Sequence, residues 1–402
     1  MSQGRIETFR GTRGQDFRQL SYTIAEAWPQ EVRSSHQGEV TVKRRNFLKK
    51  TILYPAAVSA TALASSLTAR SSAFAQKKKY RWRLALGVPR TLPIWGPGIE
   101  RFAKLVKELT DSALNIRVYG AGELVPAMET FDAVRSQKIE MGHSAAYYWQ
   151  GKIPASPFFT AVPFNTGALE TLAWLQAGGG QELYEELMQP HGVVALACGA
   201  TPAQMAGWFN KRIETQEDLK GLKIRIAGFA NRIYKAAGAS PVLVPGGEVF
   251  TSLSTGVIDA AEWVGPYHDY TIGLHKAAKY YYGPGWQEQG PLLELMINKK
   301  AWESLPKPFQ NAIRVAANDT TLWMLNEFNA KNAEYLQKIR MSSKLEILRL
   351  PDSILTLLKQ LSSEIMQEVA ARDPMAEKVR SSLLAFQKNY QDCYSVTKLS
   401  SH

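Results

Sequence analysis

The sequence predicts an α/β protein with two domains, and three observations lead to this fold class. Strand and helix periods alternate from Tyr80 to Val134, a second such series follows Gly199, and the chain beyond Pro306 has an almost entirely helical period. The chain has 402 residues, of which 45% are hydrophobic and 21% charged. That is enough apolar material to bury a core in each of two domains.

The first series begins with a strand at residues 80–86, where large apolar side chains alternate with arginines and an alanine. A turn region rich in proline and glycine, residues 87–98, then precedes a helix whose apolar face recurs at residues 99, 102, 106 and 109. Alternation at residues 114–118 predicts the next strand. Residues 131–134 belong to a further helix.

The second series begins with the turn Asp218–Gly221, which precedes a short strand ending in Arg225. A helix at residues 231–237 and a strand at residues 242–244 follow. Beyond Pro306 the apolar spacing predicts long helices. They cover residues 309–325 and 354–369.

Residues 43–75 have the order of a signal peptide. A basic stretch, Lys43–Lys50, precedes an apolar stretch at residues 51–67, and Ala73–Ala75 forms a small-residue cleavage site before Gln76. The arginine pair followed by Phe-Leu-Lys resembles a twin-arginine signal, which exports folded proteins to the periplasm. A membrane anchor is the alternative, but polar residues dilute an apolar stretch that is already short for a bilayer.

Residues 1–42 are polar and unpatterned, and they precede a signal whose arginines should stand near the start of a chain. We therefore predict that residues 1–42 are an extension that is not translated and that synthesis begins near Val42. Sequencing of an unprocessed precursor that begins at Met1 would reject this hypothesis.

The net charge of +12 does not indicate a nucleic-acid-binding protein. The 11 basic and five acidic residues before Gln76 give +6, and the 37 basic and 31 acidic residues of the remainder give another +6. This excess is spread along the chain without a basic stripe or an RNA-binding aromatic signature. With only Cys198 and Cys393, no disulfide framework can form, and Cys198 is expected in the core.

Several kinds of catalytic site are not predicted. No two of the six histidines have the i, i+4 spacing of a zinc hydrolase, and neither a P-loop nor a nucleophile elbow occurs. Gly120–Val125 begins like a dinucleotide-binding loop, but Val125 replaces its third glycine. A simple strand-to-helix turn is the alternative interpretation of this segment.

Arg225 is the strongest candidate for a binding residue. It stands at the end of a short apolar run that closes with Gly228, so a strand can direct its guanidinium toward a carboxylate ligand. Glu262 and Trp263, next to backbone freed by Gly265 and Pro266, can complete the same pocket. The alternatives are a surface arginine paired with an acid, an exposed glutamate and a packed tryptophan.

Further segments occur in a fixed order along the chain. They are Glu140-Met141-Gly142, the aromatic run Tyr147–Gly151, Pro163-Phe164, Asp218–Arg225, Glu248–Phe250 with Leu253, Gly256–Asp259, and Asn298-Lys299 with Trp302 and Leu305-Pro306. In this order they resemble the substrate-binding proteins of TRAP transporters. The resemblance extends from about Tyr80 to the helices near Glu364.

This resemblance implies a two-domain periplasmic binding protein fold with a hinge and long C-terminal helices. Domain I would comprise residues 76–198 and 284–326, and domain II residues 199–283 and 327–402. The protein would close over a small organic acid and deliver it to the TRAP membrane permease, which an ion gradient drives.

The resemblance also implies roles for individual residues. Arg225 matches the family's carboxylate-binding arginine. The aromatic run that ends in Gln150, together with Glu262 and Trp263, is similar to the subgroup that binds a 2-oxoacid or 2-hydroxyacid with a cation, Na⁺ or Ca²⁺. Gln150 and Glu262 would supply side-chain oxygens and Trp263 its backbone carbonyl. Gln287 would add a hydrogen bond from the hinge, unless it is a solvated loop residue; no organic cofactor is expected.

Three questions stay open at this stage. The apolar helical face at Val379, Leu383, Leu384 and Phe386 can form a homodimer by helix exchange or pack on its own domain. An exported enzyme is a rival function, since Glu262 and His268 are near in sequence and can serve acid–base chemistry. A third interpretation is the sensing subunit of a signalling receptor.

Overall fold

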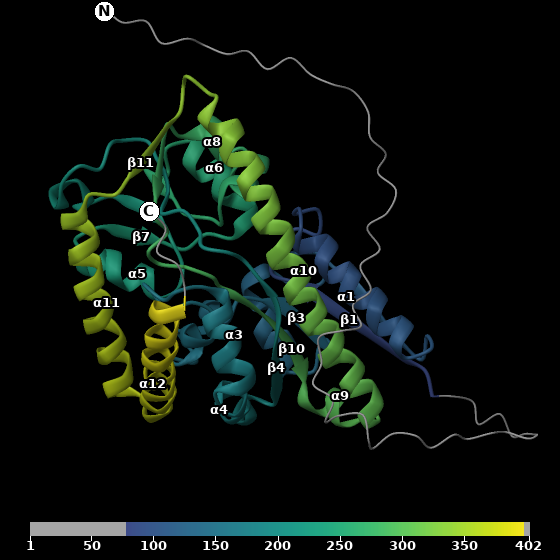
Figure 1. Cartoon of the computed structure of the whole chain (residues 1–402). Coiled ribbons are helices and arrows are strands. Elements are labelled where there is room, and N and C mark those ends of the chain that lie inside the picture. The colour runs from purple at the N-terminus through teal and green to yellow at the C-terminus, as the bar shows by residue number, and fades with distance from the viewer. Residues whose placement is uncertain (1–77, 398–402) are drawn as a thin grey trace, which may run out of the picture. The chain divides into compact units, whose positions relative to one another are not determined.

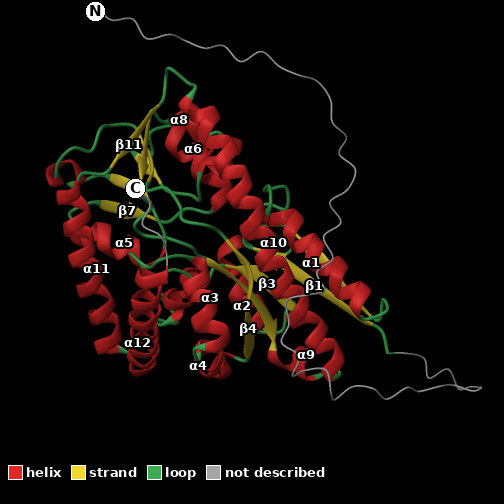
Figure 2. Ribbon diagram, in the orientation of Figure 1, coloured by secondary structure: helices red, strands yellow, loops and turns green. Residues whose placement is uncertain are grey.

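The computed structural model describes residues 78–397, and the strands of this part of the chain form two sheets (Figures 1 and 2). The first sheet has the strand order β2 (Leu114–Tyr119), β1 (Tyr80–Leu86), β3 (Met141–Ser144), β10 (Leu292–Asn298), β4 (Val193–Ala200). The second has the order β11 (Glu346–Arg349), β9 (Tyr280–Gly283), β5 (Gly207–Phe209), β8 (Ala260–Ala261), β6 (Lys223–Arg225), β7 (Ser240–Val242). The predicted α/β fold class is confirmed.

Helices surround both sheets. The shorter ones are α1 (Trp95–Leu109), α2 (Thr130–Arg135), α3 (Ala168–Ala177), α4 (Gly180–Met188), α5 (Gly228–Ala236), α6 (Val249–Ser254), α7 (Pro266–Thr271), α8 (Leu274–Ala277) and α9 (Lys299–Glu303). The long ones are α10 (Lys307–Arg340), α11 (Asp352–Arg372) and α12 (Pro374–Thr397). Short 3-10 helices are η2 (Ala127–Glu129), η3 (Ala146–Trp149), η4 (Ser156–Phe159), η5 (Gln189–His191), η6 (Gln216–Leu219) and η7 (Gly246–Glu248).

Each sheet mixes parallel and antiparallel strands, and this follows from the path of the chain. In the first sheet β1 is parallel to β2 and β3, as helical crossovers require, whereas β10 is antiparallel to both of its neighbours. In the second sheet β6 is parallel to β7 and β8. The chain passes from the first sheet to the second through residues 201–206 and returns through residues 284–291.

The two connecting segments are hydrogen-bonded to each other. The Gly285 N–H donates to the Gln204 carbonyl at 3.1 Å, and the Gln204 N–H donates to the Glu288 carbonyl at 3.0 Å. The Gln287 side chain donates to the Met205 carbonyl at 2.9 Å. These bonds bring three polar residues of the connections, Gln204, Gln287 and Glu288, close together.

The long helices pack on more than one part of the structure. Helix α10 contacts α1 and β4 of the first sheet and α7, which follows a strand of the second (Figure 1). Helix α11 lies against α5, and α12 packs against α11, α3 and α4. Val379 and Leu383 are buried there, and Phe386 approaches Gly178, so the apolar face of α12 contacts its own chain. Dimerisation stays a prediction.

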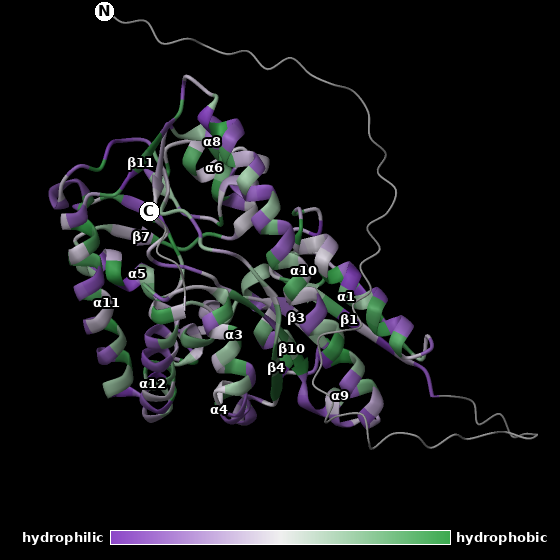
Figure 3. Ribbon diagram, in the orientation of Figure 1, coloured by the Kyte–Doolittle hydropathy of each residue, from purple (hydrophilic) through white to green (hydrophobic). Residues whose placement is uncertain are grey.

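The core follows the hydropathy of the strands. Every residue of the strand β10 is buried, and Figure 3 shows the apolar colour concentrated on β10 and β4. Cys198 is buried in β4, as predicted. The strand predicted at residues 242–244 is wrong by two residues: Gly238 turns the chain at φ 93°, and the Ser240 N–H already donates to the Leu222 carbonyl.

Within residues 78–397, no helix combines the length and the apolar character that crossing a bilayer requires. The predicted signal segment 43–75 and the extension 1–42 lie outside the described residues.

Candidate binding site

Arg225 is the last residue of β6, and its side chain is only 1% exposed. Strands β6 and β8 run parallel, with Arg225 opposite Ala261, so Glu262 leaves β8 at the same edge of the sheet. The two residues are linked first through the backbone, because the Glu262 N–H donates to the Arg225 carbonyl at 3.0 Å. Strand pairing therefore explains why residues 37 positions apart meet.

The guanidinium of Arg225 is held on several sides. Its Nη1 donates to the backbone carbonyl of Glu262 at 2.8 Å and lies 3.3 Å from the Glu262 carboxylate. Its Nη2 donates to the hydroxyl of Tyr148 at 3.3 Å, and its carbon lies 5.1 Å from the Trp263 ring. Tyr148 belongs to η3, which follows a strand of the first sheet, so these contacts join the two sheets. The alternative of a surface arginine is wrong.

Glu262 is 1% exposed, and its Oε1 has no hydrogen-bond partner among the described residues. Burial raises the pKa of this carboxyl well above its ordinary value, and the charge of Glu288 raises it further, while Arg225 opposes both. A buried acceptor oxygen of this kind is costly unless a donor or a cation satisfies it. The alternative of an exposed glutamate is wrong.

Trp263 is buried, and a close backbone approach fixes its ring. A Cβ on Gly246 would lie only 2.1 Å from Cη2 of Trp263, so η7 can contact the indole there only through glycine. After Trp263, the N–H groups of Val264 and Gly265 donate to the Asp269 carboxylate at 3.2 and 3.0 Å. Burial nevertheless raises the Asp269 pKa to about 6. This carboxylate holds the segment that carries Trp263.

Arg225, Glu262, Tyr148 and Trp263 form a cluster, and a small cavity of about 10 Å³ adjoins it. It is lined by Trp95, Tyr147, Tyr148, Thr201, Gln204, Trp263, Val264, Glu288, Pro291 and Leu293. Tyr148 and Trp263, which contact Arg225, form part of its wall, and the lining comes from both sheets and both connecting segments. The cavity volume is about that needed to hold one water molecule. The structure therefore surrounds the cluster with little free space.

The structure also locates the two predicted glutamines. Gln287 is 2% exposed, and its Oε1 has no hydrogen-bond partner among the described residues, which excludes a solvated loop residue. Gln150 is half-buried at the end of η3, where its N–H donates to the Tyr147 carbonyl at 3.2 Å. No side-chain hydrogen bond links Gln150 to Arg225 or Glu262 in residues 78–397. Gln150 thus neighbours the cluster without joining it.

Three residues of the cluster had no role in the sequence-based interpretation: Tyr148, Gln204 and Glu288. Tyr148 lies in the aromatic run, but nothing in the sequence distinguishes it from Tyr147. Gln204 donates from Nε2 to the Glu288 carboxylate at 2.9 Å. Burial raises the Glu288 pKa to about 8, although Arg225 and this hydrogen bond lower it. Gln204 and Glu288 lie in the two irregular connecting segments, and no periodic pattern in the sequence indicates that these segments contact each other.

The donor atoms are suited to a hard cation. No group of three or more His, Cys, Asp and Glu residues among residues 78–397 is arranged to hold a metal ion. However, Glu262 and Gln287 each present a buried oxygen without a donor, and oxygen is the ligand type that Na⁺ and Ca²⁺ take from proteins. The residues present therefore fit an alkali or alkaline-earth ion better than a transition metal.

His268 does not pair with Glu262. The buried imidazole contacts the Pro93 carbonyl through Nε2 at 2.5 Å, and burial lowers its pKa to about 4. Its neutral ring therefore joins α7 to the loop before α1. In the described part of the chain no hydrogen bond connects it to Glu262.

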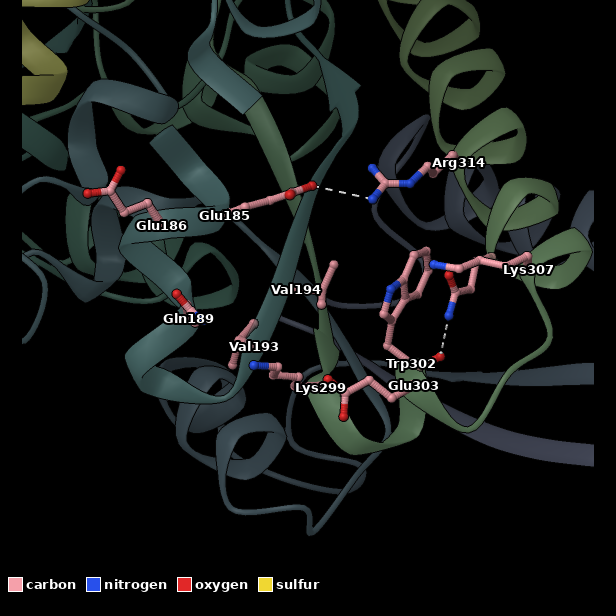
Figure 4. A pocket seen from close by; sticks show the side chains of 11 residues that line it. Glu185, Glu186, Gln189, Val193, Val194, Lys299, Trp302, Glu303, Lys307 and Arg314 are labelled. Atoms are coloured by element: carbon pink, nitrogen blue, oxygen red, sulfur yellow. Dashed lines mark hydrogen bonds and ion pairs between the residues drawn. The ribbon is translucent and has the colours of Figure 1, made fainter. Parts of the chain in front are cut away.

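A larger hollow of about 510 Å³ lies elsewhere, between α4, β4, α9 and α10 (Figure 4). Among its charged groups, Arg314 bonds Glu185 at 3.3 Å and lies 5.3 Å from the Trp302 ring. Gln310 donates to the Trp302 carbonyl at 2.9 Å. The hollow is open and has none of the buried, unpaired oxygens found near Arg225.

The chain is similar to several known proteins. It is 38% identical over 360 residues to the monocarboxylate 2-oxoacid-binding periplasmic protein all3028 of Nostoc sp. (strain PCC 7120), which is 89% of this chain and 98% of that protein. A TRAP periplasmic solute-binding protein from Pseudoalteromonas atlantica T6c, solved with sodium and pyruvate, is 39% identical with a TM-score of 0.77 and covers 80% of this chain and 97% of its own. Its counterpart from Colwellia psychrerythraea, solved with calcium and pyruvate, is 38% identical with a TM-score of 0.77 and covers 80% and 98%.

The family model of bacterial extracellular solute-binding proteins, family 7, matches residues 88–373. This range includes every strand of both sheets except β1, and it includes both connecting segments and the Arg225 cluster. The chain therefore belongs to the DctP family of bacterial extracellular solute-binding proteins.

Proposed function

We propose that this protein is the periplasmic substrate-binding subunit of a TRAP transporter. It binds a small monocarboxylate, a 2-oxoacid such as pyruvate or a 2-hydroxyacid such as lactate, together with Na⁺ or Ca²⁺, and delivers it to the membrane permease. The observation that carries the proposal is the buried Arg225 next to the unpaired carboxylate oxygen of Glu262, beside a small cavity. The relatives named with 2-oxoacids or solved with pyruvate support the substrate class.

In this proposal Arg225 binds one end of the anion. Its planar guanidinium offers two parallel N–H groups to a carboxylate, a geometry that an ammonium cannot reproduce. The hydrogen bonds to Tyr148 and to the Glu262 carbonyl fix the Arg225 guanidinium before the ligand binds. Because these contacts are already made, little side-chain entropy is lost on binding.

The cation would be held at the other side of the anion. Glu262 and Gln150 would contribute side-chain oxygens and Trp263 its backbone carbonyl, while Gln287 would hydrogen-bond the substrate. A bound cation supplies positive charge to which the carboxylate and the adjacent keto or hydroxyl oxygen of the substrate bind.

The two lobes would consist of residues 76–198 with 284–326, and residues 199–283 with 327–402. We infer that the paired connecting segments act as the hinge, since they carry the chain between the sheets. The protein would act as a receptor without turnover, and the neutral His268 bound to Pro93 gives no support to acid–base catalysis at Glu262. Export through the twin-arginine route would place it in the periplasm.

Isothermal titration calorimetry of the mature, metal-free protein tests the proposal. Pyruvate and lactate should bind when Na⁺ or Ca²⁺ is present and should bind much more weakly when it is absent. A C4-dicarboxylate should bind poorly, since none of the residues that line the small cavity is cationic and Arg225, which contacts two of them, is one cation for two carboxylates. Tight dicarboxylate binding without any cation would contradict the proposal.

A further inference from the structure

Glu294 is a buried carboxylate that the proposed function does not use. It lies within β10, a strand in which every residue is buried, and it is only 2% exposed. In the first sheet it pairs with Ser144 of β3 and with Ala197 of β4. Burying a carboxylate costs free energy, and an apolar side chain at such a place is often equally stable or more stable. Stability alone therefore does not explain this glutamate.

Both oxygens of Glu294 accept hydrogen bonds from aromatic residues. The hydroxyl of Tyr184, in α4, donates to Oε1 at 2.5 Å, and Nε1 of Trp149, in η3, donates to Oε2 at 2.9 Å. An indole N–H can only donate, so its bond to a carboxyl oxygen forms whether the carboxyl group is ionised or neutral. The side chain of Glu294 thus connects β10 to both α4 and η3.

Trp149 is the last residue of η3, and the residue before it contacts Arg225. The Trp149 side chain is 2% exposed, and its ring stacks on Phe131 with the ring centroids 5.4 Å apart. Successive side chains of a 3-10 helix point in directions about 120° apart, so Tyr148 points away from Trp149. The Tyr148 hydroxyl accepts from Nη2 of Arg225 at 3.3 Å. A four-residue helix such as η3 is not stable by itself, so its orientation depends on tertiary contacts such as the bond from Trp149 to Glu294.

We propose that Glu294 is a positioning residue of the binding site, which holds Trp149 and thereby fixes η3 so that the Tyr148 hydroxyl lies against Arg225. Tyr148 occupies one N–H of the guanidinium and orients it. Without this contact the guanidinium would be ordered only when the ligand binds, and that ordering costs affinity. The inference rests on the proposed function, because it needs Arg225 to bind the anion.

The test compares two variants that each remove one hydrogen bond from the same carboxyl group. Trp149→Phe removes the indole N–H and keeps an aromatic ring against Phe131, and Tyr184→Phe removes the bond from α4. Pyruvate affinity is measured by calorimetry in Ca²⁺, and denaturant unfolding measures the stability of each variant. Trp149→Phe should lower the affinity by about tenfold or more, since it releases η3. Tyr184→Phe should lower stability to a similar extent and keep the affinity within about threefold of wild type.

Substitutions of Glu294 itself give a second comparison. Glu294→Gln can keep both bonds, because its amide oxygen accepts from Trp149 and its amide nitrogen donates to the Tyr184 hydroxyl, so the affinity should stay within about threefold of wild type. Glu294→Leu removes both bonds with a side chain of similar size, and the affinity should fall by about tenfold or more.

Tyr148→Phe shows whether the effect passes through Tyr148. In a Tyr148→Phe background, Glu294→Leu should lower the affinity by less than about threefold, because the contact through which Glu294 acts is already absent. A purely structural role of Glu294 would give the same loss in both backgrounds. If Glu294→Leu does not fold, Trp149→Phe takes its place in this comparison.

Equal affinities of folded Trp149→Phe and Tyr184→Phe would overturn the role of Glu294. A loss from Glu294→Leu that is as large with Tyr148→Phe as without it would also overturn this role. Either result leaves the proposed function intact, provided that the wild-type protein binds pyruvate with a cation. Failure of the wild-type protein to bind any monocarboxylate would instead overturn the proposed function and, with it, this inference.

Discussion

Arg225 and Glu262 are joined by three separate contacts. The Glu262 N–H donates to the Arg225 carbonyl and so joins β8 to β6. Nη1 of Arg225 donates to the Glu262 carbonyl at 2.8 Å, which orients the guanidinium. The Glu262 carboxylate lies 3.3 Å from the same nitrogen. The second Glu262 oxygen is left without a donor in the described structure. This residue pair thus provides a cationic guanidinium and a carboxyl oxygen without a hydrogen-bond partner.

Replacement of Arg225 by lysine should weaken pyruvate binding. A lysine keeps the charge but cannot form two parallel hydrogen bonds, so we expect a loss of about 2 kcal/mol or more, which is about 30-fold in affinity. Calorimetry measures the loss, and thermal unfolding shows whether the variant is folded. Unchanged affinity in a folded variant would remove Arg225 from the binding site.

Replacement of Glu262 by glutamine should abolish most of the effect of cations on binding. The neutral amide offers a weaker oxygen to Na⁺ or Ca²⁺ and leaves Arg225 without its buried partner. In the wild type, chelation of Ca²⁺ together with replacement of Na⁺ in the buffer should reduce pyruvate affinity by at least about tenfold. Titrations of both proteins with and without these ions measure the effect. A wild-type affinity that does not respond to cations would contradict the proposed ion site.

A methyl group at Gly246 should disturb the site through Trp263. Its Cβ would lie 2.1 Å from the indole, whereas the nearest atom to a Cβ on Gly247 is Pro89 Cγ at 3.6 Å. We expect Gly246→Ala to weaken pyruvate binding by about tenfold or more, since small displacements at a binding site are costly. Gly247→Ala is the matched control and should bind normally. Equal affinities would show that the Trp263 ring does not shape the pocket.

Glu294 should make stability depend on pH. Burial raises its pKa to about 7, although Tyr184 and Trp149 donate hydrogen bonds to it. The folded state therefore holds the proton more tightly than the unfolded state, and this contribution is lost as pH rises through about 7. Between pH 4.5 and 7, the unfolding free energy of wild type should fall relative to Glu294→Gln, by at most about 3 kcal/mol. Parallel denaturant titrations measure this difference, and two parallel pH profiles would contradict it.

Much of the fold and part of the site could be predicted from the sequence. The strand at residues 80–86 and the helix beginning near Ile99 have clear periods, and the short strand before Arg225 was found from its apolar run. Arg225 was predicted from its place at the end of a strand, and Glu262 and Trp263 from the backbone that glycine and proline free beside them.

The rest depends on contacts that have no local pattern. Glu288 and Gln204 lie 84 residues apart in irregular segments, and they meet because both of these segments connect the two sheets. Tyr148 reaches Arg225 from the other sheet, which no spacing indicates. The exact position of β7 was not predicted because the strand contains Pro241, and proline ordinarily argues against a strand. It is tolerated here because β7 lies at the edge of its sheet, where its missing N–H does not have to donate to a neighbouring strand.

The most direct test of the central claim is a crystal structure of the mature protein grown with pyruvate and Ca²⁺. The account predicts the carboxylate of pyruvate on the Arg225 fork and the ion on the Glu262 side chain, at oxygen distances of about 2.3–2.6 Å. Pyruvate bound away from Arg225, or bound on Arg225 with no ion beside Glu262, would contradict it.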